Sequence, residues 1–220
     1  MKKIWFVLPL LALSILLISC SEDICKNESG LARDNCYAEQ LKCNSCNDTS
    51  VKDSCFAEKA ISVQKLEDCN KVIDVKTQGY CQHEIAVLTD DHTICEQIQD
   101  IYWEDNCHFN LAVNNSEDEF CMPISDLKQK GECIYNVALS SERAELCELL
   151  DERSREICVS KIAINSLNFE LCGEITEPIS QDSCRFKVAK LTNDSTLCPK
   201  MRFDVVRDTC KEYFNQTIVE

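Results

Sequence analysis

The string CNSC, residues 43–46, holds the side chains of this sequence that are best suited to chemistry. Two cysteines separated by two residues can form a redox dithiol or supply half of a metal site. Cys46 can instead be a buried thiol that packs in the core, or it can bond to a second chain. In the redox interpretation, Cys43 and Cys46 exchange disulfides, and Cys55 is the resolving partner. The remaining cysteines decide between these interpretations.

The cysteines recur with a period of about 26 residues. The first series is Cys43, Cys69, Cys95, Cys121, Cys147, Cys172 and Cys198. The second series is Cys55, Cys81, Cys107, Cys133, Cys158, Cys184 and Cys210, while Cys25 and Cys36 head a shortened first unit. Such a period indicates a chain built from repeated structural units.

Two pairing schemes suit this spacing. Each first-series cysteine can bond to the second-series cysteine 11 or 12 residues later, from Cys25–Cys36 to Cys198–Cys210. Alternatively, each second-series cysteine bonds to the next first-series cysteine, which leaves Cys25 and Cys210 unpaired. We favour the first scheme because it leaves no repeat cysteine over. Each bridge would contribute about 3 kcal/mol on the chain-entropy model.

The residues around the cysteines predict helices. Three positions after the first-series cysteines stand Val72, Ile98, Ile124, Leu150, Ile175 and Met201, and Cys46 occupies the same position in its unit. Five positions after the second-series cysteines stand Ala60, Ala86, Ala112, Ala138, Ala163 and Ala189. Such spacings place side chains on one helix face, and small alanines indicate close helix contact. The position of Cys46 therefore favours the core-packing interpretation of CNSC.

The pattern of each unit predicts a short helix that carries the first-series cysteine, a turn, and a longer helix that carries the second-series cysteine. The chain has only four glycines and four prolines, and no strand-like alternation persists. We therefore predict an all-α fold, an α-solenoid of about eight disulfide-linked hairpins of 26 residues. In architecture alone it resembles Sel1 and tetratricopeptide solenoids, whose period is longer, at about 34 residues.

An acidic residue usually stands two positions before the second-series cysteine. The set is Asp34, Asp53, Asp105, Glu156, Asp182 and Asp208, with Gly79 and Gly131 in the two other units. Acidic side chains favour the first turn of a helix through capping and the helix dipole. We therefore expect a helix to start near each of them, with the acidic residue in its first turn.

The amino terminus has the plan of an export signal: a basic start, an apolar run and Cys20. The segment LISC, residues 17–20, resembles the lipobox of bacterial-type lipoproteins. That resemblance implies a signal peptide over residues 1–19, cleavage before Cys20 and a diacylglycerol on its thiol. It leaves a lipidated tether over residues 20–24 and a repeat domain over residues 25–220. In a host with two membranes, Ser21 favours the outer membrane.

Composition limits the partners. A formal net charge of −15 repels nucleic acid, so we expect membrane contact through the lipid alone and a protein or peptide partner. His83, His92 and His108 lack metal-ligand spacing, and the acidic turn at Glu117–Glu119 lacks the pattern of a calcium loop, so no metal or cofactor is predicted. We expect a non-enzymatic, extracytoplasmic lipoprotein of the cell envelope that acts as a binding or structural scaffold. The alternatives are a thiol-disulfide oxidoreductase or redox sensor using Cys43 and Cys46, and an acidic envelope component that buffers cations.

Overall fold

The computed structural model describes residues 23–217, and these residues form helices joined by short connections. The long helices are α1 (Gly30–Glu39), α2 (Thr49–Val63), α4 (Val75–Thr89), α5 (Ile101–Asn115), α6 (Leu127–Ser141), α7 (Glu152–Asn165), α8 (Pro178–Thr192) and α9 (Asp204–Thr217). The short helices that precede them are η1 (Ile24–Asn27), η2 (Cys43–Ser45), α3 (Leu66–Cys69), η3 (His92–Gln97), η4 (Asp118–Cys121), η5 (Ala144–Leu149), η6 (Leu171–Glu174) and η7 (Ser195–Lys200). The described range contains no strand, so the predicted all-α class is confirmed. The predicted signal peptide and Cys20 lie outside the described residues.

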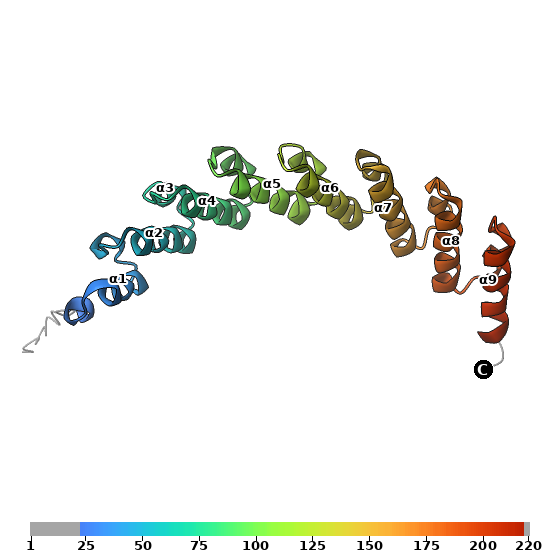
Figure 1. The fold of residues 1–220 in the computed structure, drawn as a ribbon, viewed down its shortest axis with the longest axis horizontal. Coiled ribbons are helices and arrows are strands. Elements are labelled where there is room, and N and C mark those ends of the chain that lie inside the picture. The colour runs from blue at the N-terminus through green and yellow to red at the C-terminus, as the bar shows by residue number, and fades with distance from the viewer. Residues whose placement is uncertain (1–22, 218–220) are drawn as a thin grey trace, which may run out of the picture.

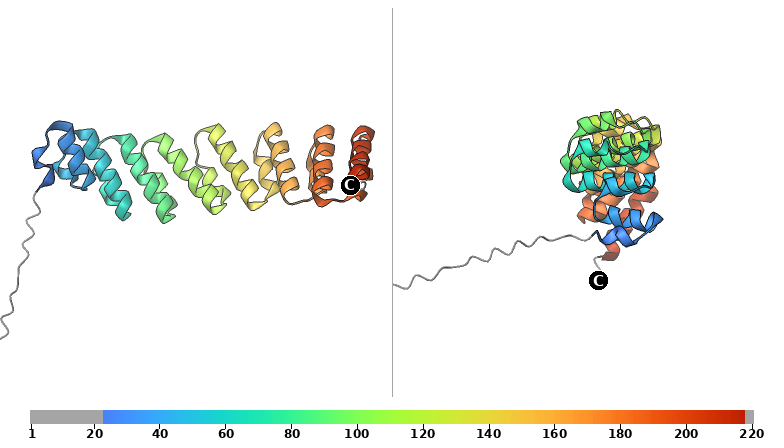
Figure 2. Two further views of the ribbon diagram at one scale, coloured as in Figure 1. Left: turned by 90° about the horizontal axis from the view of Figure 1, so that it is seen from below. Right: turned by 90° about the vertical axis from the view of Figure 1, so that its left-hand side faces the viewer.

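The hairpins stack in chain order into a curved solenoid (Figure 1). Each long helix packs against its neighbours in the sequence and against the short helices on either side. Figure 2 shows the long helices side by side along the length of the molecule. The predicted solenoid is therefore confirmed, and its stability depends on the junctions between successive units.

Eight disulfides link the short and long helices. They are Cys25–Cys36, Cys43–Cys55, Cys69–Cys81, Cys95–Cys107, Cys121–Cys133, Cys147–Cys158, Cys172–Cys184 and Cys198–Cys210. The Cα atoms of each pair are 5.4 to 5.8 Å apart, inside the range that a disulfide spans without backbone distortion. The pairing that leaves no repeat cysteine over is confirmed.

The repeated alanines lie at the tightest points of the packing. All six are fully buried, as are most of the apolar residues that follow the first-series cysteines. The carbonyl of each alanine also accepts a hydrogen bond of 2.8 to 3.0 Å from the amide five residues later, as in Lys65 to Ala60. This bond closes the helix around a residue with positive φ that is not a glycine: Gln64, Asp90, Ser116, Glu142, Leu167 and Asn193. In the first unit the amide of Lys42 bonds in the same way to the carbonyl of Tyr37, around Leu41. A side chain larger than alanine would disturb the buried contact.

The long helices start near the acidic residues that precede the second-series cysteines, as predicted, but these acidic residues do not cap them. Helices α2 and α4 to α8 are each capped by an acidic residue that precedes the helix, such as Asp48, whose side chain accepts from the amide of Val51 at 3.0 Å. Asp53 instead lies inside α2, is buried, and accepts from the amides of Ile73 and Asp74 at the start of α4, at 3.1 and 2.8 Å. The two hydrogen bonds that Asp53 accepts therefore connect one unit to the next.

Four other units repeat this arrangement. Asp34 accepts from Asn47 and Asp48, Asp105 from Ser125 and Asp126, Glu156 from Thr176 and Glu177, and Asp182 from Arg202 and Phe203. We call these five side chains, including Asp53, the inter-unit carboxylates. Asp208 is in the last unit of the described residues, and its side chain is exposed. The inter-unit carboxylates thus hold each hairpin to the next, and their physical role is to satisfy backbone amides at a junction.

Candidate functional site

The CNSC cysteines are separated by the disulfide pattern. Cys43 is bonded to Cys55, whereas Cys46 is a free thiol that is 2% exposed. The Cys46 thiol donates to the carbonyl of Asp34 at 3.3 Å. Burial raises the pKa of Cys46, and the charge of Asp34 acts in the same direction. A buried thiol with a disfavoured thiolate is a poor nucleophile, so these observations favour the core-packing interpretation over a redox pair.

The three histidines do not form a metal-binding cluster within the described residues. His83 is buried, and its Nε2 lies 2.8 Å from the Asn110 amide, while the exposed His92 ring stacks on Phe120. His108 is buried, and burial lowers its pKa against the opposing effects of nearby carboxylates. Within residues 23–217, no group of histidine, cysteine and carboxylate side chains is arranged to hold a metal ion.

Two junctions lack an inter-unit carboxylate, and both have glycine in its place. At the junction of α4 with α5, the Gly79 position faces Trp103, whose Cβ and Cδ1 atoms would lie 3.1 Å from an added Cβ. The Trp103 ring also contacts Tyr80 and Tyr102, with ring centroids 5.2 and 5.1 Å apart. An aromatic cluster therefore fills this junction where other units place a carboxylate.

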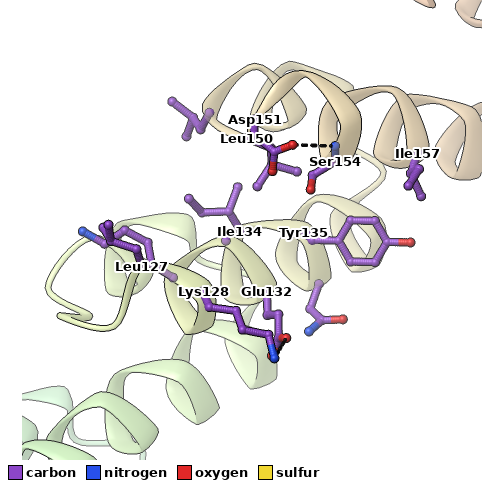
Figure 3. A pocket seen from close by; sticks show the side chains of 13 residues that line it. Leu127, Lys128, Glu132, Ile134, Tyr135, Leu150, Asp151, Ser154 and Ile157 are labelled. Carbon is purple, nitrogen blue, oxygen red and sulfur yellow. Dashed lines mark hydrogen bonds and ion pairs between the residues drawn. The ribbon is translucent and has the colours of Figure 1, made fainter.

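The second glycine leaves its junction open. An added Cβ at Gly131 would meet only Leu150 Cδ2, at 4.0 Å. Beside it lies a cavity of about 700 Å³ between α6 and α7, with a mostly apolar lining. Figure 3 shows Ile134 and Leu150 near its centre and Leu127, Tyr135 and Ile157 around it. Unlike its equivalents in neighbouring units, Leu150 is only partly buried, because the cavity exposes it.

This cavity is the end of a connected series of grooves. A groove between α1 and α2 shares Ser54 with a groove against α4 and α5, which shares Tyr102 with the groove between α5 and α6. That groove shares Lys128 and Glu132 with the cavity beside Gly131. We call these four depressions the groove series. It extends along one side of the solenoid from α1 to α7.

Exposed apolar side chains follow the same edge of the molecule. Val75, Ile101 and Leu127 are the first residues of α4, α5 and α6 and are 45%, 55% and 82% exposed. Ile179 and Val205 occupy the second position of α8 and α9 and are 60% and 78% exposed. A hydrophobic staple would require the residue before the N-cap, so helix capping does not account for this row. Apolar side chains repeated at one edge of a soluble surface indicate an interaction surface.

Comparison of the chain with protein-family models, with curated proteins and with solved structures gave no match. None of the helices within residues 23–217 is long and apolar enough to cross a membrane. In the sequence, Gly79 and Gly131 are visible as exceptions to the acidic pattern, but the pattern does not show what replaces the carboxylate. The departure from the repeat is what marks these two positions, because a glycine in the interior of a helix weakens that helix unless the backbone needs space there.

Proposed function

We propose that this chain is a lipid-anchored scaffold of the cell envelope that binds a segment of another protein along the groove series. The observation that carries this proposal is the connection of the four grooves into one surface that is longer than any single unit. Solenoids bind partners on extended surfaces because each unit adds the same kind of contact. The proposed function is therefore binding and not catalysis, in agreement with the expectation from the sequence.

The cavity beside Gly131 defines the chemistry of the partner. Its walls come from Tyr135 and Ile157, and its centre from Ile134 and Leu150. Lys128 and Glu132 point away from α7 in Figure 3, and their ammonium and carboxylate groups lie 3.7 Å apart. An apolar side chain of the partner fits the cavity, since it buries surface without leaving either charge unpaired. The partner segment should therefore contain an apolar anchor residue.

The disulfides support the proposed location. Eight bridges in a small chain are typical of proteins outside the reducing cytoplasm. The lipobox resemblance adds a membrane anchor at Cys20, on the extracytoplasmic side. Expression of the C20S variant in the host tests this anchor, because loss of the lipid should release the protein from the membrane fraction. Retention of C20S in that fraction, with no lipid on the wild-type amino-terminal peptide, would contradict it.

A peptide selection tests the binding function. A random peptide library is selected against the oxidised C20S chain that begins at residue 20, and the dissociation constants of selected peptides are measured by fluorescence anisotropy. Leu127→Glu and Ile157→Glu place a charge on the cavity and should weaken binding at least about tenfold, or about 1.4 kcal/mol. Val63→Glu and Leu191→Glu are the matched controls, because these residues are 59% and 60% exposed and line none of the four grooves.

Two results would reject the proposal. One is that no selected peptide binds with a dissociation constant below about 100 μM, near the weak end of specific recognition. The other is that the cavity variants bind as well as the two control variants.

A further inference from the structure

The negative charge of the chain is concentrated in its middle. Residues 77–127 contain no lysine or arginine, although the whole chain has 23. The same residues hold 11 of the 38 acidic side chains: Glu84, Asp90, Asp91, Glu96, Asp100, Glu104, Asp105, Glu117, Asp118, Glu119 and Asp126. Of the formal net charge of −15, −11 therefore falls on this segment and −4 on all other residues. The attraction for cations is local to α4, η3, α5 and η4.

Four of these carboxylates surround one cavity. The cavity has a volume of about 700 Å³ and lies between the end of α4, η3, α5 and η4. Its carboxylates are those of Asp90, Glu96, Glu117 and Glu119, and all four residues are exposed. No salt bridge within the described range involves any of them. The cavity thus carries four negative charges that no basic side chain compensates.

The neighbouring Asp118 shows the contrast. Its carboxylate is 2.7 Å from the guanidinium of Arg143 in the following unit, and it does not line the cavity. Of the three acidic residues at positions 117–119, only Asp118, which does not line the cavity, has a basic partner.

An aromatic wall and a buried imidazole complete the cavity. The rings of His92 and Phe120 stack with centroids 4.9 Å apart and an interplanar angle of 25°. The face of a phenyl ring such as that of Phe120 attracts a guanidinium or ammonium group. His108 also lines the cavity, is 4% exposed, and has no hydrogen-bond partner for its Nδ1 atom. Burial lowers the pKa of His108; of the residues that line the cavity with it, Glu96 opposes this shift and His92 adds to it.

The cavity is on the opposite side of α5 from the groove series. Tyr102, Asn106 and Phe109 of α5 line the groove with α6, whereas His108 and Asn115 line the acidic cavity. The two sets are about half a turn apart around a helix with 3.6 residues per turn. Occupation of one site therefore leaves the other accessible.

We propose that the acidic cavity between η3, α5 and η4 binds a cationic side chain, an arginine guanidinium or a lysine ammonium, of a protein partner. The carboxylates supply the charge, and the His92–Phe120 stack supplies a flat surface that suits a planar guanidinium. An organic cation is favoured over a metal ion because the carboxylates are not close enough together to coordinate one. A protein as the source of the cation rests on the proposed function, whereas the chemistry of the site does not.

Nuclear magnetic resonance with small probes tests this site. We would titrate ¹⁵N-labelled C20S chain with N-acetyl-arginine amide, N-acetyl-lysine amide and, as an uncharged control, N-acetyl-norleucine amide. The cationic amides should cause saturable shifts confined to η3, η4 and the second half of α5, with dissociation constants of about 1–10 mM. The norleucine amide should cause none. The absence of saturable shifts with both cationic amides, or equal shifts with norleucine, would overturn the proposal.

Matched variants connect the shifts to charge. The double variant Glu96→Gln and Glu119→Gln should weaken binding about fivefold, since each exposed pair contributes modestly. The control, Glu67→Gln and Glu145→Gln, removes the same charge from two exposed residues outside the cavity and should leave binding unchanged. Equal affinity of the two double variants would show that the net charge, and not the cavity, binds the probe.

Two further titrations identify the source of the cation. Spermidine or Ca²⁺ that saturates these positions, when the amino-acid amides do not, would reject a protein side chain as the ligand.

Leu127→Glu, on the groove series, should leave arginine-amide binding unchanged. Failure of the groove series and failure of the acidic cavity are therefore separate results.

Discussion

Substitution of the two junction glycines by alanine should change stability in opposite directions. Gly79 and Gly131 are each the fifth residue of a long helix, α4 and α6, so the gain in helix propensity is the same for both. That gain is about 0.5–1 kcal/mol for glycine to alanine in a helix interior. The surroundings of the new methyl group decide the net sign.

At Gly131 the methyl group has space. Its nearest neighbour would be Leu150 Cδ2 at 4.0 Å, an ordinary van der Waals distance. We expect Gly131→Ala to raise the free energy of unfolding by about 0.5–1 kcal/mol. At Gly79 the methyl group would lie 3.1 Å from two atoms of Trp103 and 3.3 Å from Asp100 Cβ. Because these atoms belong to the start of α5, relief requires movement of that helix, and overpacking of this kind costs about 1–3 kcal/mol. We expect Gly79→Ala to lower the free energy of unfolding by about 1 kcal/mol after the propensity gain.

Urea unfolding of the oxidised chain, followed by far-ultraviolet circular dichroism, measures both changes. Trp103 is the only tryptophan from residue 20 onward, so its fluorescence gives a second measurement. The emission of Gly79→Ala should shift in the folded state, and that of Gly131→Ala should not. Stability changes of the same sign and size in both variants would refute the reasoning, since only propensity would then matter.

Three other predictions concern single side chains. Asp53→Ala leaves two backbone amides at the start of α4 without their acceptor and should lower the free energy of unfolding in urea by about 2–3 kcal/mol. Equal loss in Asp208→Ala, an exposed residue of the last described unit, would contradict a junction role. Cys46 should react with a thiol reagent at pH 8 only after denaturation, because burial raises its pKa, and labelling of the folded chain at the rate of a free peptide thiol would disprove burial. Because burial lowers the pKa of His108, the unfolded chain binds more protons as the pH falls below about 6.5, so stability should decrease from there downward. His108→Gln should reduce that slope and the exposed His92→Gln should not; identical urea-unfolding slopes for the wild type and His108→Gln would count against it.

The sequence was sufficient to predict the unit, its pairing and its stacking. Counting of cysteines selected the pairing, because a period of 26 leaves no repeat cysteine over in one scheme only. The role of the acidic residues was not predictable in the same way. Asp53 bonds amides that follow it by 20 and 21 residues, and only the stacking of α2 on α4 brings these groups together. The helix ends were also hidden, since residues such as Gln64 and Asp90 take a left-handed conformation that sequence patterns assign to glycine.

The candidate surface was partly visible in the sequence as a departure from the repeat. Gly79 and Gly131 interrupt the acidic pattern, but a missing carboxylate does not reveal what replaces it. Trp103 fills one junction from the following helix, whereas Leu150 fills the other only in part. These outcomes depend on the packing of the next unit, so they require the structure.

The two departures lie close to the ends of the unusual segment of the chain. Gly79 lies just inside residues 77–127 and Gly131 lies four residues after them; this range lacks basic side chains and forms the acidic cavity. In a solenoid each junction contributes almost independently, so loss of an inter-unit carboxylate weakens one junction without unfolding the others. The disulfides Cys69–Cys81 and Cys121–Cys133 link the short and long helices within the two units that carry these glycines. Functional sites often depart from local sequence rules, and here the departures coincide with an apolar cavity at Gly131 and an aromatic cluster at Gly79. We therefore propose that the central units, and not the ends of the described solenoid, form the binding surface.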